Sequence, residues 1–162
     1  MRLSFRHQAW VYSIFGVLFV SGGLWLIFHY FVRVEGEFGP TMHPLEAWWL
    51  KLHGASVMVF LFLLGTLLLS HMESAWRIRR NIITGIVFVG FNSILILTGY
   101  LLYYFGGETT RPIISLIHWV VGLAAPILIG IHVWRGRAGR PGAAMRKKLH
   151  WRRPVVQPKR QH

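Results

Sequence analysis

The sequence predicts an all-α integral membrane protein, a four-helix bundle whose two termini both face the cytoplasm. Of its 162 residues, 54% are hydrophobic and only 14% are charged, which is too apolar for an ordinary soluble domain. Four windows contain no Asp, Glu, Lys or Arg: residues 10–32, 52–72, 82–107 and 112–134. About 20 apolar residues suffice for a helix to cross the hydrocarbon layer, so each window predicts one transmembrane helix.

The four helices are expected at about residues 6–32, 44–76, 81–105 and 112–134. Aromatic clusters, "WLIFHYF", "WW" and "YLLYYF", lie at helix ends on one side of the membrane, where aromatic residues favour the interface. The connection "RIRRN" is short, so the second and third helices are predicted to be antiparallel neighbours. The connection "RVEGEFGPTMHP" is longer and rich in Gly, Pro and Glu, and we expect it to be a loop.

The charged residues are divided unequally between the two sides of the predicted bundle. Fifteen of the eighteen Lys and Arg residues lie before the first helix, between the second and third helices, or after residue 134. The other side has Arg33, Lys51 and Arg111, together with Glu35, Glu37, Glu46 and Glu108. Basic loops stay cytoplasmic. We therefore expect a multi-pass protein of a bacterial inner (plasma) membrane, with its two other loops in the periplasm.

The chain is predicted to have two parts. Residues 1–135 form the transmembrane domain, and residues 136–162 form a basic cytoplasmic tail, partly disordered against anionic lipid or a partner. The net charge of +13 follows the sidedness of the membrane, so nucleic acid is not an expected partner. The absence of cysteine excludes disulfides, thiolate-held iron–sulfur clusters and haem attached covalently through Cys-x-x-Cys-His.

The two halves of the chain are weakly similar to each other. The first helix contains Ser21-Gly22 and the third contains Thr98-Gly99, and each pair is followed by an aromatic-rich end. The second helix has histidines near both ends ("KLHGA" and "SHMES"), and so has the fourth ("LIHWV" and "GIHVW"). This repeat predicts that the second and fourth helices are counterparts that run in the same direction.

Histidine is the residue type whose spacing indicates a function. His53 and His71 are 18 positions apart, which is five helical turns and about 27 Å, so both point to one side of the second helix. His118 and His132 are 14 positions apart, about 40° short of four turns and about 21 Å, so they share a face of the fourth helix. A single membrane histidine is often only hydrogen-bonded to a neighbouring helix. Two such pairs on two helices indicate a function beyond packing, because ionisable groups are costly inside a bilayer.

Two facing imidazoles indicate a cofactor that needs only two protein ligands. Zinc takes four ligands, or three plus water, usually including Cys or a carboxylate, and the spans contain neither. Haem b needs two axial ligands, which neutral imidazoles provide, and its macrocycle fills apolar volume. The pattern therefore predicts two bis-histidine haems and no catalytic residue, with these candidate iron ligands: His53, His118, His132 and His71. Four glycines leave room for the macrocycle or, alternatively, let helices pack closely: Gly54, Gly65, Gly122 and Gly130.

Three segments resemble the four-helix membrane cytochrome b subunits of formate dehydrogenases and nickel–iron hydrogenases, over about residues 5–135. "LIHWVVGLAAPILIGIHVWRGR", with its His-x13-His, is similar to their last helix, "KLHGASVM" to their second and "RHQAWVYSIFGVLFVSGG" to their first. The resemblance implies a dihaem cytochrome b, an electron-transfer subunit of a membrane oxidoreductase complex in a respiratory chain. Such a subunit passes electrons between quinone and a redox partner, here expected to be a periplasmic c-type cytochrome or another redox subunit.

The second ligand of the inner haem has two candidates. The resemblance implies a ligand from the first helix, and the matching residue here is His7. The internal repeat instead favours His71 opposite His132. The rise of about 27 Å between His53 and His71 must then match the rise of about 21 Å between His118 and His132. This requires a strong tilt or a kink near Pro126. The outer haem has the pair His53 and His118.

Other polar residues are weaker candidates. His29 and His43 are expected at the outer face, as candidates for a quinol or haem-propionate site, and Glu46 is a candidate proton acceptor. Basic side chains are candidate propionate partners or else topology signals: Arg33, Lys51 and Arg111 outside, and Arg77, Arg79 and Arg135 inside. Two other functions are open, a transporter whose histidines bind metal ions in transit and a non-redox anchor whose histidines only pack.

Overall fold

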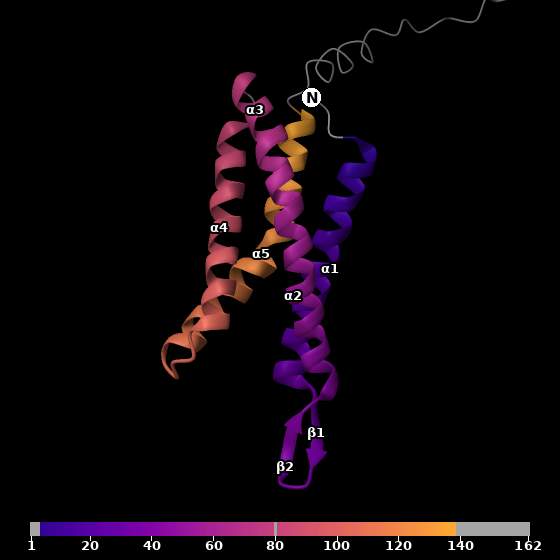
Figure 1. The fold of residues 1–162 in the computed structure, drawn as a ribbon, viewed down its shortest axis with the longest axis vertical. Coiled ribbons are helices and arrows are strands. Elements are labelled where there is room, and N and C mark those ends of the chain that lie inside the picture. Colours follow the sequence, from indigo (N-terminus) through magenta and orange to yellow (C-terminus); the bar gives the residue numbers. More distant parts are fainter. Residues whose placement is uncertain (1–3, 80, 139–162) are drawn as a thin grey trace, which may run out of the picture.

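The computed structural model describes residues 4–79 and 81–138, which form four long helices and a short hairpin (Figure 1). In chain order the elements are α1 (Phe5–Phe31), β1 (Arg33–Gly36), β2 (Gly39–Met42), α2 (Pro44–Leu67), the π-helical turn η1 (Leu68–Met72), α3 (Glu73–Arg77), α4 (Ile82–Tyr104) and α5 (Thr110–Ala138). The predicted all-α architecture is confirmed, because α1, α2, α4 and α5 are each long and apolar enough to cross a membrane.

The helix ends follow from local sequence signals. Ser4 caps α1, since its Oγ accepts a hydrogen bond from the backbone N–H of His7 at 3.2 Å. His43 caps α2, since its Nδ1 accepts the N–H of Leu45 at 3.1 Å. Pro44 then takes the first helical position, where a missing N–H costs no helical hydrogen bond. These two caps fix the residues at which α1 and α2 begin.

The connection between α1 and α2 is an antiparallel hairpin, where the sequence predicted only a loop. Gly36 pairs with Gly39 across the two-residue turn Glu37-Phe38. Gly39 has a φ of +108°, a conformation that glycine adopts without steric cost. We call this end of the molecule, where α4 also joins α5, the hairpin end. The opposite end, where α1 begins and α5 ends, is the basic end (Figure 1).

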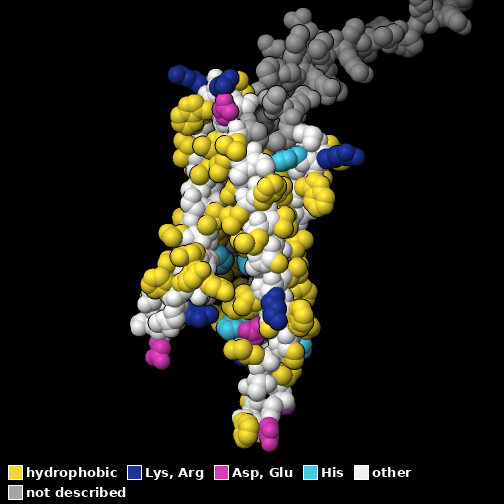
Figure 2. Space-filling model, viewed as in Figure 1, with side chains coloured by type: hydrophobic (Ala, Val, Ile, Leu, Met, Phe, Trp, Pro, Cys, Tyr) yellow, Lys and Arg dark blue, Asp and Glu magenta, His cyan; other side chains and the backbone are white. Residues whose placement is uncertain are grey.

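The helices pack as two consecutive pairs. α1 packs along α2 and α4 packs along α5, and a smaller contact joins α1 to α5. Helices α2 and α4, which the short connection predicted to be neighbours, are not among the closely packed pairs. Few hydrophobic side chains are buried in the described part of the chain: Leu64, Ile114 and Ala125. Most apolar side chains instead point outwards, as Figure 2 shows, and lipid contact suits them.

The end of α5 carries the first residues of the predicted basic tail. The helix continues to Ala138, with Arg135 and Arg137 in its last turn, where cations complement the helix dipole. The predicted partial disorder of the tail concerns residues 139–162, which lie outside the described residues.

Candidate functional site

Four histidines form two pairs, in which His53 of α2 and His71 of the following turn η1 face His118 and His132 of α5. The ring centroids of His53 and His118 are 6.3 Å apart, with their planes at 86°. The centroids of His71 and His132 are also 6.3 Å apart, with their planes at 74°. We name these the hairpin-end pair and the basic-end pair, after the end to which each is nearer. Figure 2 shows histidine side chains beside a hollow between the two helix pairs.

The neighbouring helix α1 holds the ring of His53 in orientation. Its Nδ1 lies 3.0 Å from the carbonyl oxygen of Leu18 and 3.3 Å from Oγ of Ser21. Ser21 is only 1% exposed, and its hydroxyl donates to the same carbonyl at 3.1 Å. A Cβ on Gly22 would lie 3.0 Å from Cε1 of His53, so the absence of a side chain there lets the ring approach α1.

Helix α4 holds the ring of His118 in the same way. Nδ1 of His118 lies 2.9 Å from Oγ1 of Thr98, whose hydroxyl donates to the carbonyl oxygen of Ile94 at 2.7 Å. A Cβ on Gly99 would lie 3.4 Å from Cε1 of this ring. The weak repeat in the sequence therefore has a physical basis: in each half, a small polar residue and a glycine on one helix orient a histidine on the next.

These hydrogen bonds determine which ring nitrogen is available. A carbonyl oxygen only accepts, so Nδ1 of His53 carries the proton and Nε2 keeps its lone pair. Nδ1 of His118 likewise donates to Oγ1 of Thr98, because that hydroxyl gives its own proton to the carbonyl oxygen of Ile94 at 2.7 Å. Metal-bound histidines are typically held in this manner, with the other ring N–H donated to a second group. Both rings of the hairpin-end pair are thus prepared to bind a metal through Nε2.

The basic-end pair is less enclosed. His71 is exposed, whereas His132 is half-buried and stacks on Phe88 with ring centroids 5.7 Å apart. Nδ1 of His132 is buried without a hydrogen-bond partner among the described residues. The ring of His132 is therefore oriented mainly by packing on α4.

The π turn η1 changes the direction in which His71 points. A π turn closes bonds from residue i to i+5 and so takes up about one residue more than an α turn. The 18 positions from His53 to His71 then correspond to about 17 α-helical positions. The side chains of His53 and His71 therefore point about 100° apart around the helix axis, and the rise between the two residues falls to about 25 Å. The straight-helix projection, which placed both rings on one side of α2, does not apply.

The geometry of α5 completes the match between the two helices. Figure 1 shows α5 inclined to α2 and bent along its length. Pro126 lies inside α5, where proline removes a backbone hydrogen bond and kinks a helix. Because α5 crosses α2 obliquely, the side of α2 that faces α5 changes from one end to the other. The tilt, the bend and η1 together bring two histidine pairs of unequal sequence spacing to the same separation.

His7, the other candidate partner of His132, lies in a different environment. Its Nε2 is 3.5 Å from Oγ1 of Thr66, a long contact, and the ring that faces His132 is that of His71. Which of the two binds the inner haem stays a prediction.

The separation of each pair suits two imidazoles on opposite sides of one metal ion. A metal–imidazole bond is about 2.0 Å and the ring nitrogen lies roughly 1.1 Å from the ring centre, so opposite ligands have centroids roughly 6 Å apart. No group of three or more His, Cys, Asp or Glu gathers in the described residues 4–79 and 81–138. Each pair therefore offers two nitrogen ligands, which fits an axially ligated haem better than a tetrahedral zinc site.

The glycines that approach the histidine rings are not the four that the sequence named as leaving room for a macrocycle, and that role of the four stays a prediction. An added Cβ would meet open space or only an ordinary contact at all four predicted positions: Gly54, Gly65, Gly122 and Gly130. The close approaches are at Gly22 and Gly99. Sequence reasoning used these two only as markers of the repeat, because nothing in the one-dimensional pattern shows which histidine lies against them.

The basic candidates lie at the two ends of the bundle, and two of them have described partners. Arg77 forms an exposed ion pair with Glu73 at 2.7 Å, and the Lys51 ammonium lies 4.6 Å from the ring centre of Trp48. The remaining guanidinium groups are exposed: Arg33, Arg79, Arg111 and Arg135. Their pairing with haem propionates stays a prediction.

The polar candidates at the hairpin end have separate roles. His43 has a structural role as the cap of α2, and its ring contacts Phe28 edge-on at 5.0 Å. His29 and Glu46 form a close pair between α1 and α2, with Nδ1 of the histidine 2.6 Å from Oε1 of the glutamate. The sequence named both residues but did not pair them, because they are separated by the whole hairpin.

Comparisons of the chain with protein-family models, with curated proteins and with solved structures found no match.

Proposed function

We propose that this protein is a membrane dihaem cytochrome b that relays electrons between the quinone pool and a redox partner. The observation that carries the proposal is the equal 6.3 Å separation of two histidine pairs, each with only two nitrogen ligands. Bis-histidine ligation needs this number of ligands, and apolar helices supply the dry surroundings that a haem requires. The resemblance of three helices to known cytochrome b subunits points to the same function.

The charge distribution supports an orientation for this proposal. The hairpin end faces the periplasm and the basic end faces the cytoplasm of a bacterial inner membrane, because basic segments stay on the cytoplasmic side. The hairpin-end pair then lies in the outer part of the membrane and the basic-end pair in the inner part. Ligands at two depths suit a protein that must move electrons across a bilayer.

Each histidine has a defined role in the proposal. His53 and His118 would hold the outer haem b, and His71 and His132 the inner one. Bound haem supplies a one-electron centre at each position, with a potential set by its ligands and surroundings. The chain contributes the oriented Nδ1–H groups, since a hydrogen bond from the far ring nitrogen makes Nε2 a stronger ligand.

The hairpin supplies a contact surface for a soluble redox partner. Its tip carries Glu35 and Glu37 beside Phe38, whose side chain is 97% exposed. An acidic surface around an exposed aromatic ring suits a partner with a basic surface, because complementary charges steer association. A periplasmic c-type cytochrome or another redox subunit with such a surface fits this end of the molecule.

A reduced-minus-oxidised visible spectrum of the purified full chain tests the proposal. We expect b-type bands and two haems per chain, with one haem lost in His53→Ala and one in His132→Ala. His43→Ala is the matched control, because that histidine only caps α2, and it should keep both haems. A colourless protein from haem-replete cells would overturn the proposal. Stoichiometric metal without haem bands would favour the metal-ion transporter instead.

A further inference from the structure

A buried glutamate with an unpaired oxygen lies at the hairpin end, apart from the histidine pairs. The Glu46 side chain is 8% exposed, and its Oε1 is 2.6 Å from Nδ1 of His29. Its other oxygen, Oε2, is buried without a hydrogen-bond partner among the described residues, and so is Nε1 of Trp49 one turn later. Buried polar atoms are rarely left unpaired. Two of them one turn apart point to a ligand that pairs with them.

The pair of side chains has a defined hydrogen-bonding character. With the carboxylate ionised and the ring neutral, Nδ1 of His29 donates to Oε1 and the lone pair of the ring is on Nε2. The stack of this ring on Trp25, with centroids 4.7 Å apart and planes at 17°, holds its orientation. The site therefore presents two acceptors, Oε2 of Glu46 and Nε2 of His29, and one donor, the Nε1–H of Trp49. It suits a ligand with hydroxyl groups, such as a diol, because a hydroxyl oxygen donates and accepts.

The surroundings indicate that the ligand is soluble in lipid. A groove of about 460 Å³ runs between α1 and α2, lined among others by Gly16 and Val20 of α1 and by Trp49 and Leu52 of α2. Its wall is largely apolar, and Val20 and Leu52 are exposed on the surface that meets lipid in a membrane. The groove therefore offers room for an apolar chain next to the polar site, since Trp49 belongs to both.

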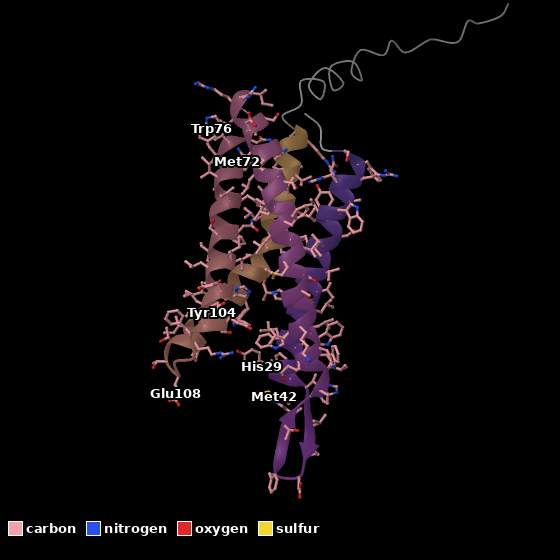
Figure 3. The ribbon with its side chains drawn as sticks, in the orientation of Figure 1. His29, Met42, Met72, Trp76, Tyr104 and Glu108 are labelled. Carbon is pink, nitrogen blue, oxygen red and sulfur yellow. The ribbon has the colours of Figure 1, made fainter. Side chains whose placement is uncertain are left out.

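The site is close to the hairpin-end histidine pair. Glu46 precedes His53 by seven positions, which is about 20° short of two turns and about 10 Å along α2. Both residues therefore lie on nearly the same face of this helix. Figure 3 shows His29 at the hairpin end of the bundle, above Met42 of the hairpin.

We propose that Glu46 and His29 bind the head group of a quinol, a lipid-soluble aromatic diol, and accept its protons when it is oxidised. The two hydroxyls donate to Oε2 of Glu46 and Nε2 of His29. Oxidation of one quinol to quinone releases two electrons and two protons. One proton goes to the carboxylate, one to the imidazole, and both leave to the solvent at the hairpin end. The two electrons would pass one to each haem of the proposed function. Only this electron route rests on the proposed function.

The test compares binding with electron delivery in the full chain. Calorimetric titration with decylubiquinol under anaerobic conditions measures binding, and the rate at which decylubiquinol produces the reduced b-type bands measures delivery. Dithionite then reports the total reducible haem. We expect Glu46→Gln to weaken binding about tenfold, as loss of a charged hydrogen bond does, and to slow reduction by at least about 100-fold, as loss of a general base does. Dithionite should reduce both haems fully.

Two further variants separate the site from general damage. His29→Gln should slow quinol-driven reduction while keeping both haems, because it removes one of the two acceptors. Gly16→Phe should raise the KM for decylubiquinol with little change in kcat, because it fills the groove and leaves the polar site intact. Glu108→Gln, an exposed glutamate in the connection between α4 and α5 at the hairpin end, is the matched control and should behave as the wild type.

The outcomes distinguish this inference from the proposed function. Wild-type binding and wild-type reduction rates in both Glu46→Gln and His29→Gln would overturn the quinol site while leaving the dihaem proposal intact. A haem-free protein that still binds decylubiquinol, with the affinity lowered by Glu46→Gln, would support the quinol site and remove only the electron route. A haem-free protein without such binding would overturn both.

Discussion

Replacing Gly22 with alanine tests whether α1 positions the outer haem ligand. The new Cβ would lie 3.0 Å from Cε1 and 3.1 Å from Nδ1 of His53, whereas carbon atoms pack at about 3.5–4.0 Å. The ring must therefore move by a few tenths of an ångström. The hydrogen bond from Nδ1 to the Leu18 carbonyl, now 3.0 Å, then lengthens towards the limit of a hydrogen bond. Loss of such an orienting bond typically costs 10–100-fold in metal affinity, so we expect the outer haem to bind about 10–100-fold more weakly.

The measurement is haem content and haem affinity of the purified variant, by pyridine haemochrome assay and by titration of haem into protein stripped of it. Gly23→Ala is the matched control, because a Cβ on this neighbouring residue meets nothing within 4 Å. Gly99→Ala should have an intermediate effect, since its Cβ would lie 3.4 Å from Cε1 of His118 and needs only a small adjustment. If Gly22→Ala binds two haems as tightly as Gly23→Ala does, α1 does not hold the ligand as described.

Three further predictions concern the other parts of the two histidine pairs. His71→Ala should lose one haem and His7→Ala should keep two, as counted by haemochrome assay; the reverse result would restore the ligand set implied by the resemblance. Thr98→Val should weaken outer haem binding more than Ser21→Ala, because its bond to the ring is 2.9 Å and the other is 3.3 Å; equal haem affinities would contradict this. Deleting Leu69 should convert η1 to an α turn and keep both haems, whereas inserting an alanine there should rotate His71 by about 100° and lose the inner haem. Identical spectra for these two variants would show that η1 does not aim the ring.

The four spans were predictable because a bilayer imposes a simple requirement on sequence. A crossing helix needs about 20 residues without charge, and that pattern is local and one-dimensional. The same holds for the repeat, since Ser21-Gly22 and Thr98-Gly99 stand at corresponding places in two helices. The hairpin was missed because its two strands are only four residues long, too short for alternation of side chains to show.

Histidine spacing and helical periodicity were enough to predict which helices carry the candidate ligands. They were not enough to predict which imidazole faces which, because the sequence-based projection of His53 and His71 assumed a straight α-helix. The turn η1 and the oblique course of α5 change the direction and depth of His71, whose ring centroid lies 6.3 Å from that of His132. The approach of Gly22 to His53 and the pairing of His29 with Glu46 were also beyond the sequence. Such contacts join residues far apart in the chain, and only the packing of one helix against another brings their side chains together.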